Sequence, residues 1–237
     1  MLQDRRGKGI KMFAADASGP KIFRIDPAAI SGEAIREAAA ILRSGGVVIY
    51  PTETFYALGA VPTIEKAVER VFEIKGRDIG KALPLIASDL QAVLCAASQW
   101  PEPAAKLARL FWPGPLSLIV PASASLPPAL HAGTGKIAVR VSSHPVASLL
   151  ARASGGLIIS TSANLAGGPA AESPSRIDAG LLASVEAVLD AGNLPGGFPS
   201  TIVDVSDHPA VLVREGKIAP KEILMALEGR SERFAPG

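Results

Sequence analysis

Short runs of apolar residues alternate along the chain with segments in which apolar residues recur at helical spacing. The runs predict strands at 47–50, 83–87, 116–120, 137–141, 157–160, 185–189, 201–205 and 210–214. The segments with helical spacing predict helices at 64–72, 90–97, 103–111, 144–153, 175–183 and 221–228. Thr63 and Asp89 stand directly before two of these helices, where their side chains can accept hydrogen bonds from the first turn.

This order of elements predicts an α/β fold. Strands separated by helices favour a largely buried sheet with parallel pairs, and the last two strands are close enough along the chain to pair antiparallel. We therefore expect one domain with a twisted, mixed sheet flanked by helices. No stretch rich in Gly, Ser or Pro divides the chain, so the expected organisation is a flexible tail over 1–20, the domain over 21–217, and a helix and tail over 218–237.

The charge of the chain is unevenly placed. The 237 residues carry 24 Lys and Arg against 22 Asp and Glu, but Arg5, Arg6, Lys8 and Lys11 fall near the beginning. The remainder is close to neutral, which argues against a protein that binds nucleic acid through a wide phosphate contact. The single cysteine permits no internal disulfide, and there is neither a secretory leader nor a run of about 18 apolar residues. We therefore expect a cytoplasmic protein with no membrane partner.

Polar loops follow two of the predicted strands. Thr52, Glu53 and Thr54 follow the strand at 47–50, and hydroxyl and amide side chains crowd into 160–164. Because the carboxyl ends of strands border the ligand crevice in open α/β sheets, these side chains are candidates for binding phosphate or ribose oxygens, or else for capping the next turn. Glu53 is a candidate general base or magnesium–water ligand, or it orders its loop.

Cations accompany these loops. Lys75 and Arg77 lie where a predicted helix ends, Arg140 interrupts an apolar strand, and Arg214 ends another. A single strand arginine is usually a surface group that extends its charge into water. Several cations beside strand ends, in a body that is otherwise near neutral, instead indicate a site that binds a polyphosphate.

Six ordered segments carry a resemblance to a known family. They are 47–60 (VVIYPTETFYALGA), 75–85 (KGRDIGKALPL), 112–120 (WPGPLSLIV), 137–145 (IAVRVSSHP), 160–167 (STSANLAG) and 200–204 (STIVD), followed by Arg214. In this order they resemble the YrdC-like threonylcarbamoyl-AMP synthase family, over about 22–217.

The resemblance implies a twisted α/β domain with a concave cationic surface. It implies synthesis of threonylcarbamoyl-AMP from L-threonine, bicarbonate or CO2, and ATP, with release of pyrophosphate, for the threonylcarbamoyl modification of adenosine 37 in tRNAs that read ANN codons. It also implies Mg2+ bound with ATP rather than at a dedicated protein site, and a threonylcarbamoyl-transferase machinery as acceptor of the product. A contact with tRNA or double-stranded RNA is a further implied partner.

The resemblance also implies roles for individual residues. Catalytic roles fall on Lys75, Arg77 and Arg140. ATP contacts fall on Arg77, Ser162, Asn164 and Arg214. Contacts to L-threonine fall on Thr54, Arg140, the Ser160 backbone and Ser200. The segment 78–82 is the expected mobile lid.

Four positions depart from the family pattern. Ala57 stands where a glycine is usual, Ser88 where many longer members have a histidine, Lys136 where a threonine is common, and Ala170 where a small hydroxyl often touches the nucleotide.

Two other functions remain open. One is a non-catalytic module that binds double-stranded RNA or tRNA, with steeply salt-dependent affinity and no ATP-dependent release of pyrophosphate. The other is carbamoyl-adenylate formation in hydrogenase maturation, which the lack of Cys-rich fingers disfavours.

Overall fold

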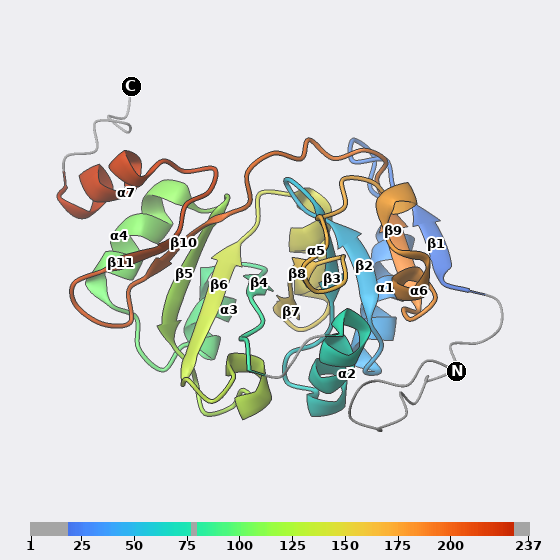
Figure 1. The fold of residues 1–237 in the computed structure, drawn as a ribbon, viewed down its shortest axis with the longest axis horizontal. Coiled ribbons are helices and arrows are strands. Elements are labelled where there is room, and N and C mark those ends of the chain that lie inside the picture. Colours follow the sequence, from blue (N-terminus) through green and yellow to red (C-terminus); the bar gives the residue numbers. More distant parts are fainter. Residues whose placement is uncertain (1–18, 77–79, 230–237) are drawn as a thin grey trace.

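The computed structural model describes residues 19–76 and 80–229, in which the strands form two mixed sheets (Figure 1). The five-stranded sheet has, in spatial order, β1 (Lys21–Arg24), β9 (Ala187–Asp190), β2 (Val48–Pro51), β3 (Tyr56–Gly59) and β8 (Thr161–Ser162). The six-stranded sheet has β11 (Val211–Arg214), β10 (Thr201–Asp204), β5 (Leu116–Pro121), β6 (Lys136–Val141), β4 (Leu85–Ala87) and β7 (Leu157–Ile159). Figure 1 shows the two sheets side by side, with β5, β6, β10 and β11 on the left and β1, β2 and β9 on the right.

Helices cover the sheets and close two apolar cores. The helices are α1 (Gly32–Arg43), α2 (Glu65–Lys75), α3 (Leu90–Ala96), α4 (Glu102–Phe111), α5 (Pro145–Ala153), α6 (Ala179–Leu182) and α7 (Pro220–Leu227), with short 3-10 turns at Pro128–His131 and Pro174–Arg176. Val48 and Tyr50 of β2 face the core formed with α1 and α5, and Val47 and Ile49 face the larger core. Burial on both faces explains why β2 is a continuous apolar run.

The chain passes from one sheet to the other at Ser160. β7 forms an edge of the six-stranded sheet, and β8 forms an edge of the five-stranded sheet. The Ile159 amide donates to the Ala60 carbonyl (2.9 Å), and the Ser160 amide donates to the Pro84 carbonyl (2.8 Å). Backbone hydrogen bonds therefore hold this junction on both sides, and the polar residues that follow Ile159 lie between the two sheets.

The predicted fold class is confirmed: the structure is an α/β fold with mixed sheets flanked by helices. The division into two sheets was not predicted. Each predicted strand is present, although 157–160 ends at Ile159 where the chain changes sheet. Asp89 caps α3 as predicted, its carboxylate accepting from the Ala92 amide (2.9 Å), whereas α2 has Ile64 rather than Thr63 at its N-cap.

Other differences concern whole elements rather than single residues. The predicted helix at 175–183 is a 3-10 turn followed by the four-residue α6, because the Asp178 carboxylate caps a new helix by accepting from the Leu181 amide (3.0 Å). Helix α1 and strands β1, β3 and β8 were missed. The helix predicted at 221–228 is present as α7. Within the described residues, no helix combines the length and the apolarity needed to cross a bilayer.

Gly59 of β3 allows the ring of Tyr50 to pack against the backbone. A β-carbon at position 59 would lie 2.7 Å from Tyr50 Cε1, and Tyr50 is fully buried with its hydroxyl donating to the Ile159 carbonyl (3.0 Å). Gly59→Ala is therefore expected to lower the free energy of unfolding by about 1–3 kcal/mol through overpacking, as measured by urea unfolding. Gly80→Ala is the matched control, because no atom of the described residues lies within 4 Å of its β-carbon position. Equal stability of the two variants would contradict this account.

Candidate active site

A cavity of about 470 Å³ opens where the two sheets meet. The loop after β2, strand β3 and strand β8 line it from the five-stranded sheet, and β5, β6, β10 and β11 line it from the six-stranded sheet. The polar side chains that line it are those of Thr52, Glu53, Thr54, Ser117, Arg140, Ser160, Thr161, Ser162, Ser200 and Arg214. The cavity thus collects hydroxyl groups and guanidinium groups from segments that are far apart in the sequence.

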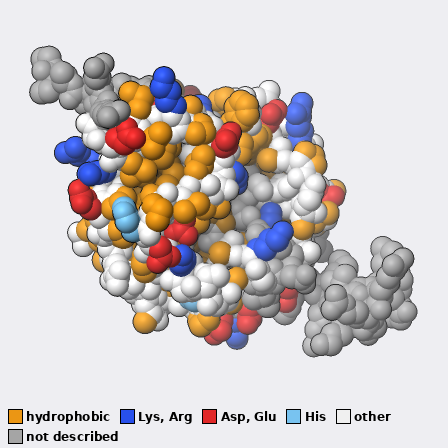
Figure 2. All heavy atoms as spheres, turned by 60° about the vertical axis from the view of Figure 1, so that its left-hand side comes forward, with side chains coloured by type: hydrophobic (Ala, Val, Ile, Leu, Met, Phe, Trp, Pro, Cys, Tyr) orange, Lys and Arg blue, Asp and Glu red, His pale blue; other side chains and the backbone are white. Residues whose placement is uncertain are grey.

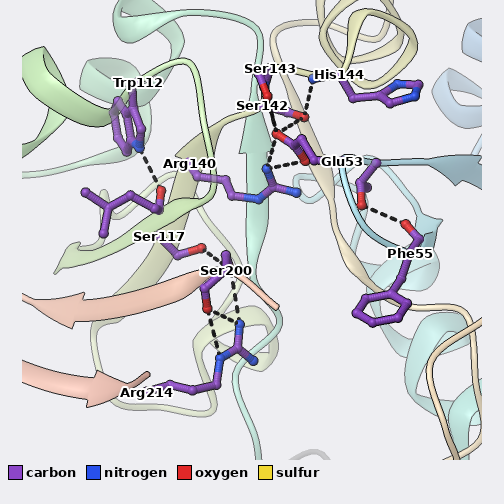
Figure 3. Close-up of polar contacts among 12 residues, drawn as sticks. Glu53, Phe55, Trp112, Ser117, Arg140, Ser142, Ser143, His144, Ser200 and Arg214 are labelled. Atoms are coloured by element: carbon purple, nitrogen blue, oxygen red, sulfur yellow. Dashed lines mark hydrogen bonds and ion pairs between the residues drawn. The ribbon is translucent and has the colours of Figure 1, made fainter. Parts of the chain in front are cut away.

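Glu53 and Arg140 form an ion pair across the two sheets. Arg140 Nη1 lies 2.7 Å from both carboxylate oxygens of Glu53 (Figure 3). The side chain of Glu53 is only 11% exposed, and that of Arg140 only 10%. Glu53 Oε1 also accepts from the Ser142 hydroxyl (2.8 Å) and the Ser143 amide (2.7 Å). Glu53 therefore fastens the loop after β2 to the loop after β6.

The ionisation of Glu53 follows from these partners. Burial alone would raise its pKa, but the charge of Arg140 and the hydrogen bonds from Arg140 and Ser142 outweigh burial and lower the pKa to about 2. A carboxylate this acidic accepts a proton poorly near neutral pH, and its oxygens are already engaged. Of the three roles predicted for Glu53, the contacts favour ordering of the loops.

A second guanidinium approaches the cavity from β11. Arg214 donates from Nε (3.1 Å) and Nη2 (2.8 Å) to the Ser200 carbonyl, and from Nη2 to the Ser200 hydroxyl (3.0 Å). Partial burial and then repulsion from Arg140 lower the pKa of Arg214, which nevertheless stays charged. Two cations that repel each other across a cavity favour an anion between them.

A second cavity, of about 560 Å³, adjoins the first across strand β8. Thr161 and Ser162 line both cavities, and Lys75, Lys81 and Asn164 line the second. This arrangement gives a bound molecule two adjacent compartments separated by one short strand.

Lys75 holds the loop between these cavities. Its ammonium group donates to the carbonyls of Ser162 (2.6 Å) and Asn164 (2.9 Å) and to Asn164 Oδ1 (3.3 Å), and the residue is 4% exposed. The Ser162 hydroxyl also donates to Asn164 Oδ1, and Asn164 Nδ2 donates to the Gly168 carbonyl. Lys75 at the end of α2, Ser162 at the end of β8 and Asn164 after it are therefore parts of one hydrogen-bonded unit.

Lys75→Met keeps the length of the side chain but removes its three donors. Two carbonyls of a part-buried loop then lose their charged partner, and we expect the free energy of unfolding to fall by about 1–3 kcal/mol, as measured by urea unfolding. Lys66→Met on the same helix is the control, because Lys66 is exposed. A Lys75 variant as stable as the Lys66 variant would show that these hydrogen bonds contribute little.

The structure brings most of the predicted site residues together. Thr54, Arg140, Ser160, Ser162, Ser200 and Arg214 line the first cavity, and Lys75, Ser162 and Asn164 line the second. Arg77 and positions 78 and 79 of the expected lid lie outside the described residues. Sequence reasoning missed Ser117, Ser142 and Ser143. A serine between two leucines of an apolar strand was the available signal for Ser117.

Of the four positions that depart from the family pattern, two line the first cavity and two lie outside its lining. Ala57 lies in β3 opposite Tyr50 and Ser162 rather than in a turn, so extended backbone accepts its β-carbon without strain. Ala57 and Ala170 line the first cavity. Ser88 donates to Asp89 (3.0 Å), and Lys136 pairs with Asp204 (3.3 Å) and Asp207 (2.7 Å), so both have local partners outside the lining of that cavity.

Comparisons with known proteins agree with this picture. The two sheets and the cavity with its two guanidinium groups define an α/β protein suited to anionic ligands. The model of the Sua5_yciO_yrdC family, described as "Telomere recombination", matches residues 40–216. The chain therefore belongs to the Sua5/YciO/YrdC family.

Two relatives share its sequence closely. The threonylcarbamoyl-AMP synthase of Pyrococcus abyssi is 37% identical over 189 residues, which are 80% of this chain and 56% of that protein. The synthase of Methylococcus capsulatus is 44% identical over 138 residues, which are 58% of this chain and 74% of that protein. The chain spans only about half the length of the Pyrococcus abyssi and Bacillus subtilis relatives.

Solved structures agree on the fold. The crystal structure of P. abyssi Sua5 complexed with L-threonine has a TM-score of 0.81 and 34% identity, covering 88% of this chain and 61% of that one. The crystal structure of E. coli YciO has a TM-score of 0.76 and 32% identity, covering 84% of this chain and 96% of that one.

Proposed function

We propose that this protein is a threonylcarbamoyl-AMP synthase, a nucleotidyltransferase that joins L-threonine, bicarbonate or CO2, and ATP and releases pyrophosphate. The observation that carries the proposal is the pair of guanidinium groups, Arg140 and Arg214, at one cavity beside the Ser160–Ser162 crossing. The synthase names of the relatives and the L-threonine complex of P. abyssi Sua5 support the same reaction.

The two compartments divide the substrates. Arg140 binds the carboxylate of L-threonine, and the remaining contacts to the amino acid come from Thr54, the Ser160 backbone and Ser200. ATP extends from the first compartment, which Arg214 lines, into the second, which Asn164 lines, and Ser162 borders both. Arg77 is its remaining predicted contact. Lys75 acts by holding the Ser162–Asn164 loop in place, which its hydrogen bonds support.

The chemistry proceeds without an enzyme nucleophile. The amine of L-threonine attacks CO2 and loses a proton to water to give a carbamate, and a carbamate oxygen then attacks the α-phosphorus of ATP. The bond from that phosphorus to the bridging oxygen breaks, and the electron pair leaves with pyrophosphate. Two anions must meet in this step. Positioning lowers the activation free energy, by about 7–11 kcal/mol in favourable cases. The fixed cations offset the negative charge of the carbamate and of the leaving pyrophosphate.

Magnesium enters as part of the ATP substrate. Within residues 19–76 and 80–229, no group of three or more His, Cys, Asp or Glu side chains could hold a metal ion, and the Glu53 oxygens are occupied by donors. These residues do not fit a resident metal. Mg2+ bound with ATP would take phosphate oxygens and water as its ligands.

The product is consumed elsewhere. We propose that a threonylcarbamoyl-transferase machinery in the cytoplasm accepts it for modification of adenosine 37 in tRNAs reading ANN codons. On the face shown in Figure 2, basic side chains are scattered among acidic and hydrophobic ones, an arrangement that favours a small-molecule site over a wide RNA contact on that face.

The decisive experiment mixes the purified chain with ATP, Mg2+, bicarbonate and L-threonine, and follows threonylcarbamoyl-AMP by mass spectrometry and pyrophosphate by a coupled assay. We expect both products in equal amounts, and neither without L-threonine. Absence of both products, together with salt-dependent binding of tRNA, would instead support the RNA-binding module.

A further inference from the structure

Two hydroxyl groups lie between the two guanidinium groups of the first cavity. Figure 3 shows Ser117 and Ser200 between Arg140 and Arg214. Leu118 of β5 stands opposite Val139 of β6, so the adjacent residues, Ser117 and Arg140, both point to the other face of the sheet. Ser117 is 4% exposed, and its hydroxyl lies 3.1 Å from that of Ser200.

Arg214 occupies one acceptor position of the Ser200 hydroxyl. A guanidinium only donates, so the Ser200 oxygen accepts from Arg214 Nη2 (3.0 Å). The bond between the serines then runs one way or the other. In either case one serine proton is used between the two oxygens, and the other proton remains for a bound molecule. Within the described part of the chain, Ser117 Oγ has no further hydrogen-bond partner.

The charge at this place suits a monoanion. The described charged residues that line the first cavity are Glu53, Arg140 and Arg214, and Glu53 offsets one of the two cations. A single positive charge beside one free hydroxyl proton matches a carboxylate better than a polyphosphate.

We propose that Ser117 is a positioning residue for the carboxylate of the amino-acid substrate. It fixes the hydroxyl of Ser200, so that the pair directs one proton to a carboxylate bound at Arg140, between the two guanidinium groups. The inference rests on the proposed function and adds a residue on β5 that acts through Ser200.

The test compares Ser117→Ala, Ser117→Thr and a control, Ser125→Ala. Ser125 forms a similar hydroxyl pair with Ser123 (3.0 Å), but in an exposed loop that is not part of either cavity lining. We expect Ser117→Ala to raise KM for L-threonine about tenfold and KM for ATP less than about twofold. Ser117→Thr restores the hydroxyl and therefore most of the affinity, and Ser125→Ala behaves as wild type.

L-threoninol, which lacks the carboxylate, separates orientation of the anion from general damage. The wild-type protein should prefer L-threonine to L-threoninol about ten times more strongly than Ser117→Ala does. Thermal unfolding verifies that each variant is folded. If Ser117→Ala is not folded, Ser117→Cys, which keeps the size of the side chain, replaces it.

The outcomes distinguish this inference from the proposed function. An unchanged KM for L-threonine, an equal rise in both KM values, or an unchanged preference over L-threoninol would overturn the role of Ser117 while wild-type synthesis stands. A wild-type protein that neither binds L-threonine in calorimetry nor forms the adenylate would overturn both.

Discussion

Arg140→Ala is expected to lower kcat/KM for L-threonine at least about 100-fold. The substitution removes a charge-assisted, paired donor to the substrate carboxylate, and a loss of this size corresponds to about 2.7 kcal/mol. It also leaves the Glu53 carboxylate buried without its cation. We expect the free energy of unfolding to fall by about 3 kcal/mol, at the low end for a broken buried pair because Ser142 and Ser143 still donate to Glu53.

The double variant Glu53→Gln with Arg140→Ala separates these two effects. Removing both charges eliminates the uncompensated carboxylate, so stability should recover relative to Arg140→Ala. Activity should stay lost, because the guanidinium group that binds the substrate carboxylate is still absent. Steady-state kinetics and urea unfolding measure the two quantities. Recovery of activity along with stability would show that Arg140 acts only through the fold.

The apolar pattern predicted the strands well because most of them are buried on at least one face. The run 47–50 corresponds to β2, between two cores, and the run 137–141 corresponds to β6, with Val139 in the larger core and Arg140 in the cavity. Helix α1 was missed, although its buried residues recur at helical spacing: Ala34, Ile35, Ala38, Ala39 and Leu42. Three of these five residues are alanines, whose small side chains give only a weak apolar signal in the sequence. The buried face becomes evident only from the packing of α5 on α1.

Strand β3 and the change of sheet at Ser160 could not be predicted in the same way. Both are decided by pairing with distant segments: β3 pairs with β2 and with β8, and β7 pairs with β4. A strand of two to four residues, as in β8, β7 and β3, has too short a pattern to specify its neighbour.

The candidate site was predictable in its chemistry but not in its connections. Arginines in apolar strands and hydroxyls after strand ends indicated an anion site, and six predicted residues line one cavity. The partner of Glu53 lies 87 residues away, and the principal acceptors of Lys75 are backbone carbonyls, which no side-chain pattern shows. The sequence therefore indicated which groups carry charge, and the fold determines which of those charges are offset.

Acid unfolding should reveal the ionised Glu53 directly. Its pKa falls from the usual 4.5 to about 2 in the folded protein, so the folded state favours the carboxylate form. This difference contributes about 3 kcal/mol of stability, fully present above the unfolded pKa and lost as the pH falls toward 2. By pH 3 about 2 kcal/mol of it should be gone. The stability difference between wild type and Glu53→Gln should therefore shrink by about that amount between pH 6 and pH 3.

Glu102→Gln provides the matched control for this titration. Glu102 pairs with Lys106 on α4 (3.0 Å), but its side chain is 78% exposed, so water screens the pair. Urea unfolding of wild type and both variants at closely spaced pH values gives the two difference curves. The curve for Glu53→Gln should bend below pH 5, and by much more than the curve for Glu102→Gln. Parallel curves would mean that Glu53 is not held as a carboxylate by Arg140, and the proposed binding of substrate by that arginine would need another geometry.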